Sequence, residues 1–118
     1  MDLGTGVRVR LEPSDEGTHP VEAAKNFNES MYINAFDHGR RLGGWFRVGN
    51  RPNEGHAEMS CCLYLPDGRV AFLFARPEKR DNEAFAAAGL SIVVTEPFRK
   101  LRVRYEGKLC VLRDPQAM

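Results

Sequence analysis

Two pairs of an acid and a histidine are the residues of this chain that could do acid–base chemistry. Asp37 directly precedes His38, and Glu54 stands two residues before His56. A carboxylate that orients an imidazole can create a general base. Both pairs lie in glycine-containing stretches typical of turns, and no serine or cysteine has the context of a known nucleophile. The four residues are catalytic candidates, although the pattern favours turn roles for them.

Aromatic residues in strand-like segments could instead line a site for an apolar molecule. Trp45 is the only tryptophan of the chain and follows Gly43-Gly44. Its ring either fills the core, which the pattern favours, or forms the floor of a pocket. The ligand-binding candidates combine rings with polar side chains, and they are Asn34, Phe36, Trp45, Arg47, Tyr64 and Phe72. The sequence does not say which face of each strand points inward.

Composition excludes several other kinds of site. Three cysteines, of which Cys61 and Cys62 are adjacent, indicate reduced thiols in the cytoplasm rather than a disulfide framework. No spacing of cysteine or histidine suits a metal, and no cofactor motif is present, so we expect neither a bound metal nor a cofactor. The net charge of +1 does not favour nucleic-acid binding. No apolar stretch is long enough for a membrane span.

Short alternating segments separated by turn residues must position these side chains. Pro66-Asp67-Gly68 is the clearest turn, and it predicts an antiparallel hairpin between its flanking strands. The other reversals are Asp37-His38-Gly39 and a tight one at Glu106-Gly107-Lys108. The alternation predicts strands at 31–36, 44–49, 57–65, 69–76, 90–97, 100–107 and 108–114.

One short helix interrupts this pattern, around residues 82–88. The run EAFAAA favours a helix, Asp81 or Asn82 could cap it, and Gly89 would end it. Residues 1–29 read as a partly extended N-terminal extension, in which VRVRLE (7–12) alternates like a strand. Residues 30–115 form the main domain. The fold class is therefore all-β, an antiparallel meander curled into a sandwich or barrel.

Several motifs together resemble a known family. They are Asn28-Glu29-Ser30-Met31-Tyr32, Leu42-Gly43-Gly44-Trp45, Arg51-Pro52-Asn53-Glu54-Gly55, Leu65-Pro66-Asp67-Gly68-Arg69 and the stretch from Glu96 to Gly107. Residues 26–115 are similar to the N-terminal lipocalin-like half of bacterial proteins related to the carotenoid hydratase (hydroxyneurosporene synthase) and AttH-like superfamily. The resemblance implies a calycin-type barrel, partial or closed, that is one half of a larger two-domain protein. The acids of the hydratases cannot be placed in this chain, so their activity does not carry over.

Three functions remain open at this point. The first is a lipocalin-like domain that binds a hydrophobic small molecule such as a lipid, isoprenoid or steroid. The second is a hydratase- or cyclase-like enzyme, with Asp37 or Glu54 as acid and His38 or His56 as its partner. The third is a structural half-domain whose exposed sheet edges join a second copy or a second lipocalin-like domain.

Overall fold

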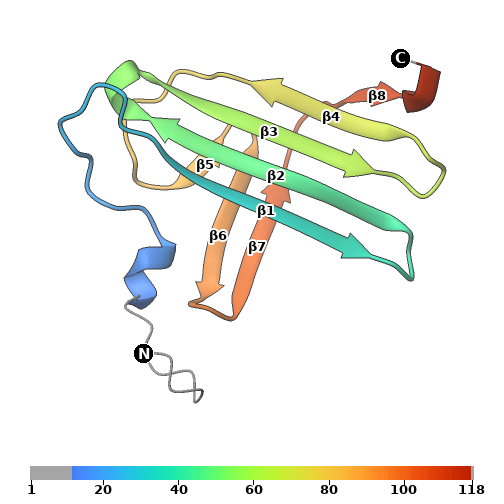
Figure 1. Cartoon of the computed structure of the whole chain (residues 1–118), viewed down its shortest axis with the longest axis horizontal. Coiled ribbons are helices and arrows are strands. Elements are labelled where there is room, and N and C mark those ends of the chain that lie inside the picture. Colours follow the sequence, from blue (N-terminus) through green and yellow to red (C-terminus); the bar gives the residue numbers. More distant parts are fainter. Residues whose placement is uncertain (1–11, 118) are drawn as a thin grey trace.

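The computed structural model describes residues 12–117, which fold into two antiparallel β-sheets (Figure 1). The larger sheet has the strand order β1-β2-β3-β4-β8, and the smaller one has the order β5-β6-β7. In the view of Figure 1, β6 and β7 cross the strands of the larger sheet at a steep angle. The sheets do not close on one another, so the predicted all-β antiparallel fold is confirmed as a partial barrel. The strands are β1 (Glu29–Asp37), β2 (Leu42–Arg51), β3 (His56–Tyr64), β4 (Val70–Ala75), β5 (Phe85–Ala87), β6 (Leu90–Glu96), β7 (Lys100–Tyr105) and β8 (Cys110–Leu112).

The hairpin predicted at Pro66-Asp67-Gly68 is confirmed. Gly68 has φ of 89°, which is a conformation that glycine adopts without strain, and its N–H donates to the Leu65 carbonyl at 3.0 Å. The Asp67 carboxylate accepts from the N–H of Arg69 at 3.0 Å. From this turn β3 and β4 pair without a register shift along the whole of β4.

The predicted helix around 82–88 is wrong. Phe85–Ala87 form strand β5, and Ala88 and Gly89 turn the chain with φ of 49° and 89° into β6. Phe85 is buried in the core, and the Lys79 ammonium donates to the carbonyl of Ala84, just before β5, at 2.7 Å and to that of Ala86, within β5, at 2.8 Å. Alanine prefers a helix by only a few tenths of a kcal/mol (~0.5) per residue, so burial of Phe85 and strand pairing outweigh the local preference.

The predicted meander is interrupted at two places: β5 begins a second sheet instead of pairing with β4, and the last strand returns to the first sheet. β8 pairs with β4 in the larger sheet instead of with its predecessor β7. Residues 106–109 therefore carry the chain from one sheet to the other, and the Tyr105 hydroxyl stabilises this crossing by donating to the Lys108 carbonyl at 2.7 Å. Pairing with β8 covers part of the edge that β4 would otherwise expose.

The hydrophobic core lies between the two sheets. Side chains alternate along each strand, so only one face of the larger sheet contributes to this core. Its buried members are Val48, Met59 and Cys61 from the larger sheet and Phe85, Leu90 and Ile92 from the smaller one. The other face of the larger sheet has no second layer among the described residues.

Side-chain hydrogen bonds hold residues 12–28 against the sheets. This segment contains one 3-10 helix, η1 (Pro13–Glu16), and no strand. The amide of Asn53 donates to the carbonyls of Glu22 and Ala24 at 2.7 and 2.8 Å, and that of Asn82 donates to the His19 carbonyl at 2.8 Å. The strand predicted at 7–12 lies outside the described residues except for its last position. Within residues 12–117, no helix is long and apolar enough to cross a membrane.

Candidate functional site

All six predicted ligand-binding residues lie on the outer face of the larger sheet, away from the core. Residues directly opposed in an antiparallel pair share a face. The register opposes Asn34, Trp45, Cys62 and Phe72 in one row across β1 to β4. A second row contains Phe36, Gly43, Tyr64 and Val70, and a third contains Tyr32, Arg47, Ser60 and Phe74. The residues between these rows, such as Ile33 and Phe46, pack against the core instead.

Six rings make up what we call the aromatic face: Tyr32, Phe36, Trp45, Tyr64, Phe72 and Phe74. Trp45 lies in the middle, with its ring centroid 6.2 Å from that of Tyr32 and 6.1 Å from that of Phe74. Tyr32 is 54% exposed and Phe74 is 59% exposed, although both are large and largely apolar. Exposed apolar rings gathered on one face make this surface a candidate for contact with another molecule.

Gly43 makes room for one of these rings. A Cβ at this position would lie 2.1 Å from Cδ1 of Phe36, because the ring of Phe36 covers the glycine from the neighbouring strand. The Phe36 ring then stacks on Tyr64, with centroids 6.1 Å apart. The core position that the sequence favours for Trp45, after Gly43-Gly44, is wrong, because the register places its ring on the outer face. The ring that Gly43 accommodates is that of Phe36.

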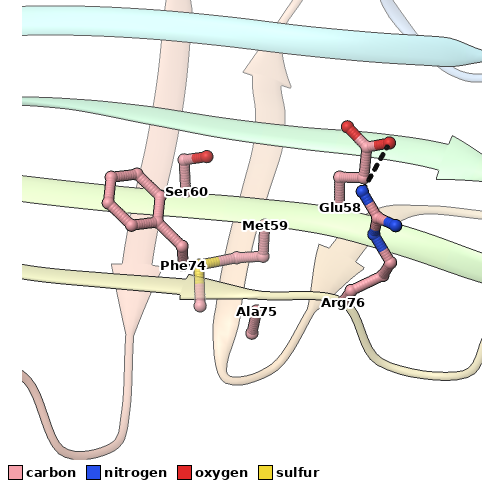
Figure 2. A pocket seen from close by; sticks show the side chains of 6 residues that line it. All are labelled: Glu58, Met59, Ser60, Phe74, Ala75 and Arg76. Carbon is pink, nitrogen blue, oxygen red and sulfur yellow. Dashed lines mark ion pairs between the residues drawn. The ribbon is translucent and has the colours of Figure 1, made fainter.

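A charged group that we call the arginine cluster lies at one end of the aromatic face: Arg47, Arg51 and Arg76 around Glu58. The Glu58 carboxylate lies 3.3 Å from Nη1 of Arg47, 3.0 Å from Nε of Arg51 and 3.9 Å from Nη2 of Arg76. Gly49 permits the first contact, because a Cβ there would lie 2.7 Å from the Arg47 guanidinium. Figure 2 shows Glu58 and Arg76 close together, with Phe74 and Ser60 farther along the same two strands.

The arginine side chains keep Glu58 ionised. Partial burial by itself would raise the pKa of this carboxyl group, but the charges of Arg51, Arg47 and Arg76 outweigh it and lower the pKa below its ordinary value. Glu58, Ser60, Phe74 and Arg76 also line an open hollow of about 280 Å³, together with Met59 and Ala75. The charged and aromatic parts of the face therefore meet in one depression.

The four catalytic candidates lie at opposite ends of the sheet. Asp37 is the last residue of β1 and His38 the first of the turn to β2, and the Asp37 carboxylate lies 3.6 Å from Nε of Arg40. Glu54 ends the 3-10 helix η2 (Pro52–Glu54), and His56 begins β3. A strand of ten residues, β2, separates the two ends by ~30 Å.

Glu54 and His56, the acid and histidine predicted as partners, do not form an ion pair with each other. Glu54 lies 3.3 Å from Nη1 of Arg51, and the acid found near His56 is Glu58, at 3.9 Å. Among residues 12–117, no three histidine, cysteine or acidic side chains are arranged to hold a metal ion.

Sequence reasoning missed three charged residues of the face: Arg51, Glu58 and Arg76. The alternation within 57–65 places Glu58 on the same face as Tyr64, and this is the signal that could have found it. Arg76 lies just beyond β4, so its proximity to Glu58 depends on the register between β3 and β4. The pairing of Arg76 with Glu58 could not be recognised from the sequence.

A separate groove lies between β1 and the turn that joins β6 to β7. Met31, Ile33, Phe98 and Leu101 contribute to its lining, and its volume is about 400 Å³. Phe98 has φ of 62°, an unusual conformation for a bulky residue, and its N–H donates to the Glu16 carboxylate at 2.7 Å. The groove is the alternative location for an apolar ligand.

Comparison with known proteins identifies a family. A family profile described as "Domain of unknown function (DUF7064)" matches residues 12–116. Searches among curated proteins and among solved structures find no match. The family match includes every strand of both sheets, all six rings of the aromatic face and the arginine cluster. Because it spans most of the sequence, the chain belongs to the DUF7064 family.

Proposed function

We propose that the domain binds an apolar small molecule, such as a lipid, isoprenoid or steroid, on its aromatic face. The observation that carries the proposal is the gathering of six rings on the face opposite the core, four of which are more than 40% exposed. A ligand that covers these rings removes apolar surface from water, which contributes ~25 cal/mol per Å². The resemblance to the carotenoid hydratase superfamily points to the same class of ligand.

Two further observations bear on the proposal, one on the ligand and one on the compartment. Hollows of about 280 and 260 Å³ lie at the two ends of the aromatic face, so a molecule lying along it would fit into both. The free thiols of Cys61, Cys62 and Cys110 suit a reducing compartment, and the cytoplasm is part of the proposal.

Quenching of Trp45 fluorescence by retinol tests the proposal. Trp45 is the only tryptophan and lies in the middle of the face, so a bound isoprenoid alcohol changes its emission directly. Phe74→Ala removes a ring in contact with Trp45 and should weaken retinol binding about tenfold, since such a contact contributes ~1–1.5 kcal/mol.

Phe98→Ala is the matched control, because it removes an exposed ring from the groove between the sheets. Retinol affinity should be unchanged in this variant. Loss of binding in Phe98→Ala, with full binding in Phe74→Ala, would place the ligand in the groove and refute the proposed site. Circular dichroism confirms that both variants are folded.

A second candidate function is self-association through β1. This strand forms an edge of the larger sheet, and its nine residues contain no lysine or proline that would block pairing with another strand. Sedimentation velocity of the ligand-free protein should then reveal a dimer that dissociates on dilution. Ala35→Lys should abolish this dimer and Ala84→Lys, which lies outside β1, should not. A monomer at all concentrations would rule this function out.

A further inference from the structure

The arginine cluster contains more positive charge than its carboxylates neutralise. Arg47, Arg51 and Arg76 surround Glu58, and Glu54 is the other acid in contact with them, at 3.3 Å from Arg51. Three guanidinium groups carry many more N–H donors than two carboxylates can accept. Nε of Arg51 is buried and, although it lies 3.0 Å from Glu58, does not have the geometry of a hydrogen bond.

Burial makes this surplus of charge costly. The side chains of Arg47 and Arg51 are each only 27% exposed, so water solvates their charge incompletely. Arg76 is 70% exposed, and its contact with Glu58 is a long one of 3.9 Å, so the Arg76 side chain can reorient towards a second anion at little cost. An anion at this position would be held by charge-assisted hydrogen bonds, which are the strong ones for guanidinium groups.

Only at this end of the face are arginines largely buried. At the other end Arg40 is 83% exposed and lies 3.6 Å from Asp37, Arg69 is 46% exposed and lies 2.6 Å from Asp67, and Arg41 is exposed, so water solvates their charge. The hollow at that end is lined by Asp37, His38 and Arg41 together with Phe36 and Tyr64. A ligand with one charged end is therefore oriented by the face.

We infer that the ligand of the aromatic face is an apolar molecule with a terminal carboxylate, whose charged end binds the arginine cluster. This inference rests on the proposed function, because the rings hold the apolar part. The charged end lies on the Arg76 side of the hollow that Glu58, Ser60 and Phe74 also line, where it replaces the 3.9 Å contact of Arg76 with Glu58. The chain or ring system then extends over Trp45 towards Phe36. Arg47 lies in the same row as Tyr32, Ser60 and Phe74, so it contacts both parts of the ligand.

Retinoic acid and retinol form a matched pair of probes, because they share their ring and chain and differ in the terminal carboxylate. Quenching of Trp45 should show that retinoic acid binds about tenfold more tightly than retinol. The preference should decrease with added salt, because screening weakens exposed charge interactions. Arg76→Gln should reduce the ratio of the two affinities about threefold or more.

Arg80→Gln is the control, since Arg80 is 76% exposed, pairs with Glu78 and lies outside the cluster. It should keep the full preference for the acid. Equal affinities for the two probes in the wild type would overturn the inference while the proposed function stands. Binding of neither probe would overturn both. A preference that is lost in Arg41→Gln and kept in Arg76→Gln would place the charged end at the opposite hollow, which contradicts the inference.

Discussion

At the scale of single residues, two glycines with the same backbone conformation have different surroundings. Gly68 and Gly89 both have φ of 89°. A Cβ on Gly68 would meet nothing within 4 Å, whereas one on Gly89 would lie 2.1 Å from the Glu106 carbonyl oxygen. Gly89 thus serves both the turn into β6 and the close packing of that turn on the end of β7.

Gly89→Ala should therefore destabilise the domain more than Gly68→Ala. The strain of a positive φ costs alanine ~1 kcal/mol at either position. The clash with backbone at Glu106 should add ~1–3 kcal/mol at position 89 alone. Urea unfolding of the two variants gives the comparison directly. Equal losses of unfolding free energy would show that the chain relaxes around the new methyl group.

At the scale of elements, a histidine ties the N-terminal segment to β1. Nε2 of His19 lies 2.9 Å from the Asp15 carboxylate, and Nδ1 lies 3.0 Å from that of Glu29, the first residue of β1. Hydrogen bonds to Asp15 and then to Glu29 raise the pKa of His19, while backbone and His19 hydrogen bonds lower that of Asp15. The tether is strongest when the imidazole is protonated and both acids are ionised.

The stabilisation by His19 should therefore depend on pH. Because the folded-state pKa of His19 is raised, its contribution is complete below the ordinary value of 6.5 and is lost as the pH rises through the raised value. The contribution of Asp15 also stabilises the fold but has the opposite pH dependence. Because the pKa of Asp15 is lowered, its contribution is complete above 3.8 and is lost as the pH falls through the lowered value. The difference in unfolding free energy between wild type and His19→Gln should be largest between these values.

Urea unfolding at a series of pH values measures this difference. His38→Gln, in the turn between β1 and β2, is the matched control, and its difference from the wild type should be smaller at pH 5 than that of His19→Gln. A difference for His19→Gln that grows above pH 8 would contradict the role of the protonated imidazole.

At the scale of the whole molecule, a five-stranded sheet has a core on one face and rings open to solvent on the other. Neighbouring residues of the smaller sheet reveal which side is the core: Ile92 is 3% exposed and Val93 is 49% exposed. Ile92→Ala should cost ~2–4 kcal/mol of unfolding free energy, because it leaves a cavity between the sheets. Val93→Ala should cost less than ~1 kcal/mol, since its side chain already contacts water. Similar costs in thermal or urea unfolding would mean that the two sheets do not share this core.

The sequence by itself determined the strands and most of the turns. Alternation and turn residues depend on neighbours in the chain, so the hairpin at residues 66–68 and the strands that flank it were predictable. Within single strands, a period of two places Asn34 with Phe36 and Trp45 with Arg47. The register between the strands then brings both pairs onto one face with Tyr64 and Phe72. The local pattern failed at 82–88, where burial of Phe85 and pairing with β6 outweigh the weak helical preference of alanine.

Only the tertiary structure decided which face is covered. β4 is apolar on both faces, and Trp45 fits a core as well as a surface, so the pattern of either segment is compatible with both arrangements. The choice depends on where the smaller sheet packs, and on β8 returning to β4, both of which are contacts between distant parts of the chain. The arginine cluster has the same origin, because Arg76, Glu58 and Arg47 meet only when three strands are in register. Local energies favour a strand, and the burial of apolar surface between the sheets selects the side that remains exposed to solvent.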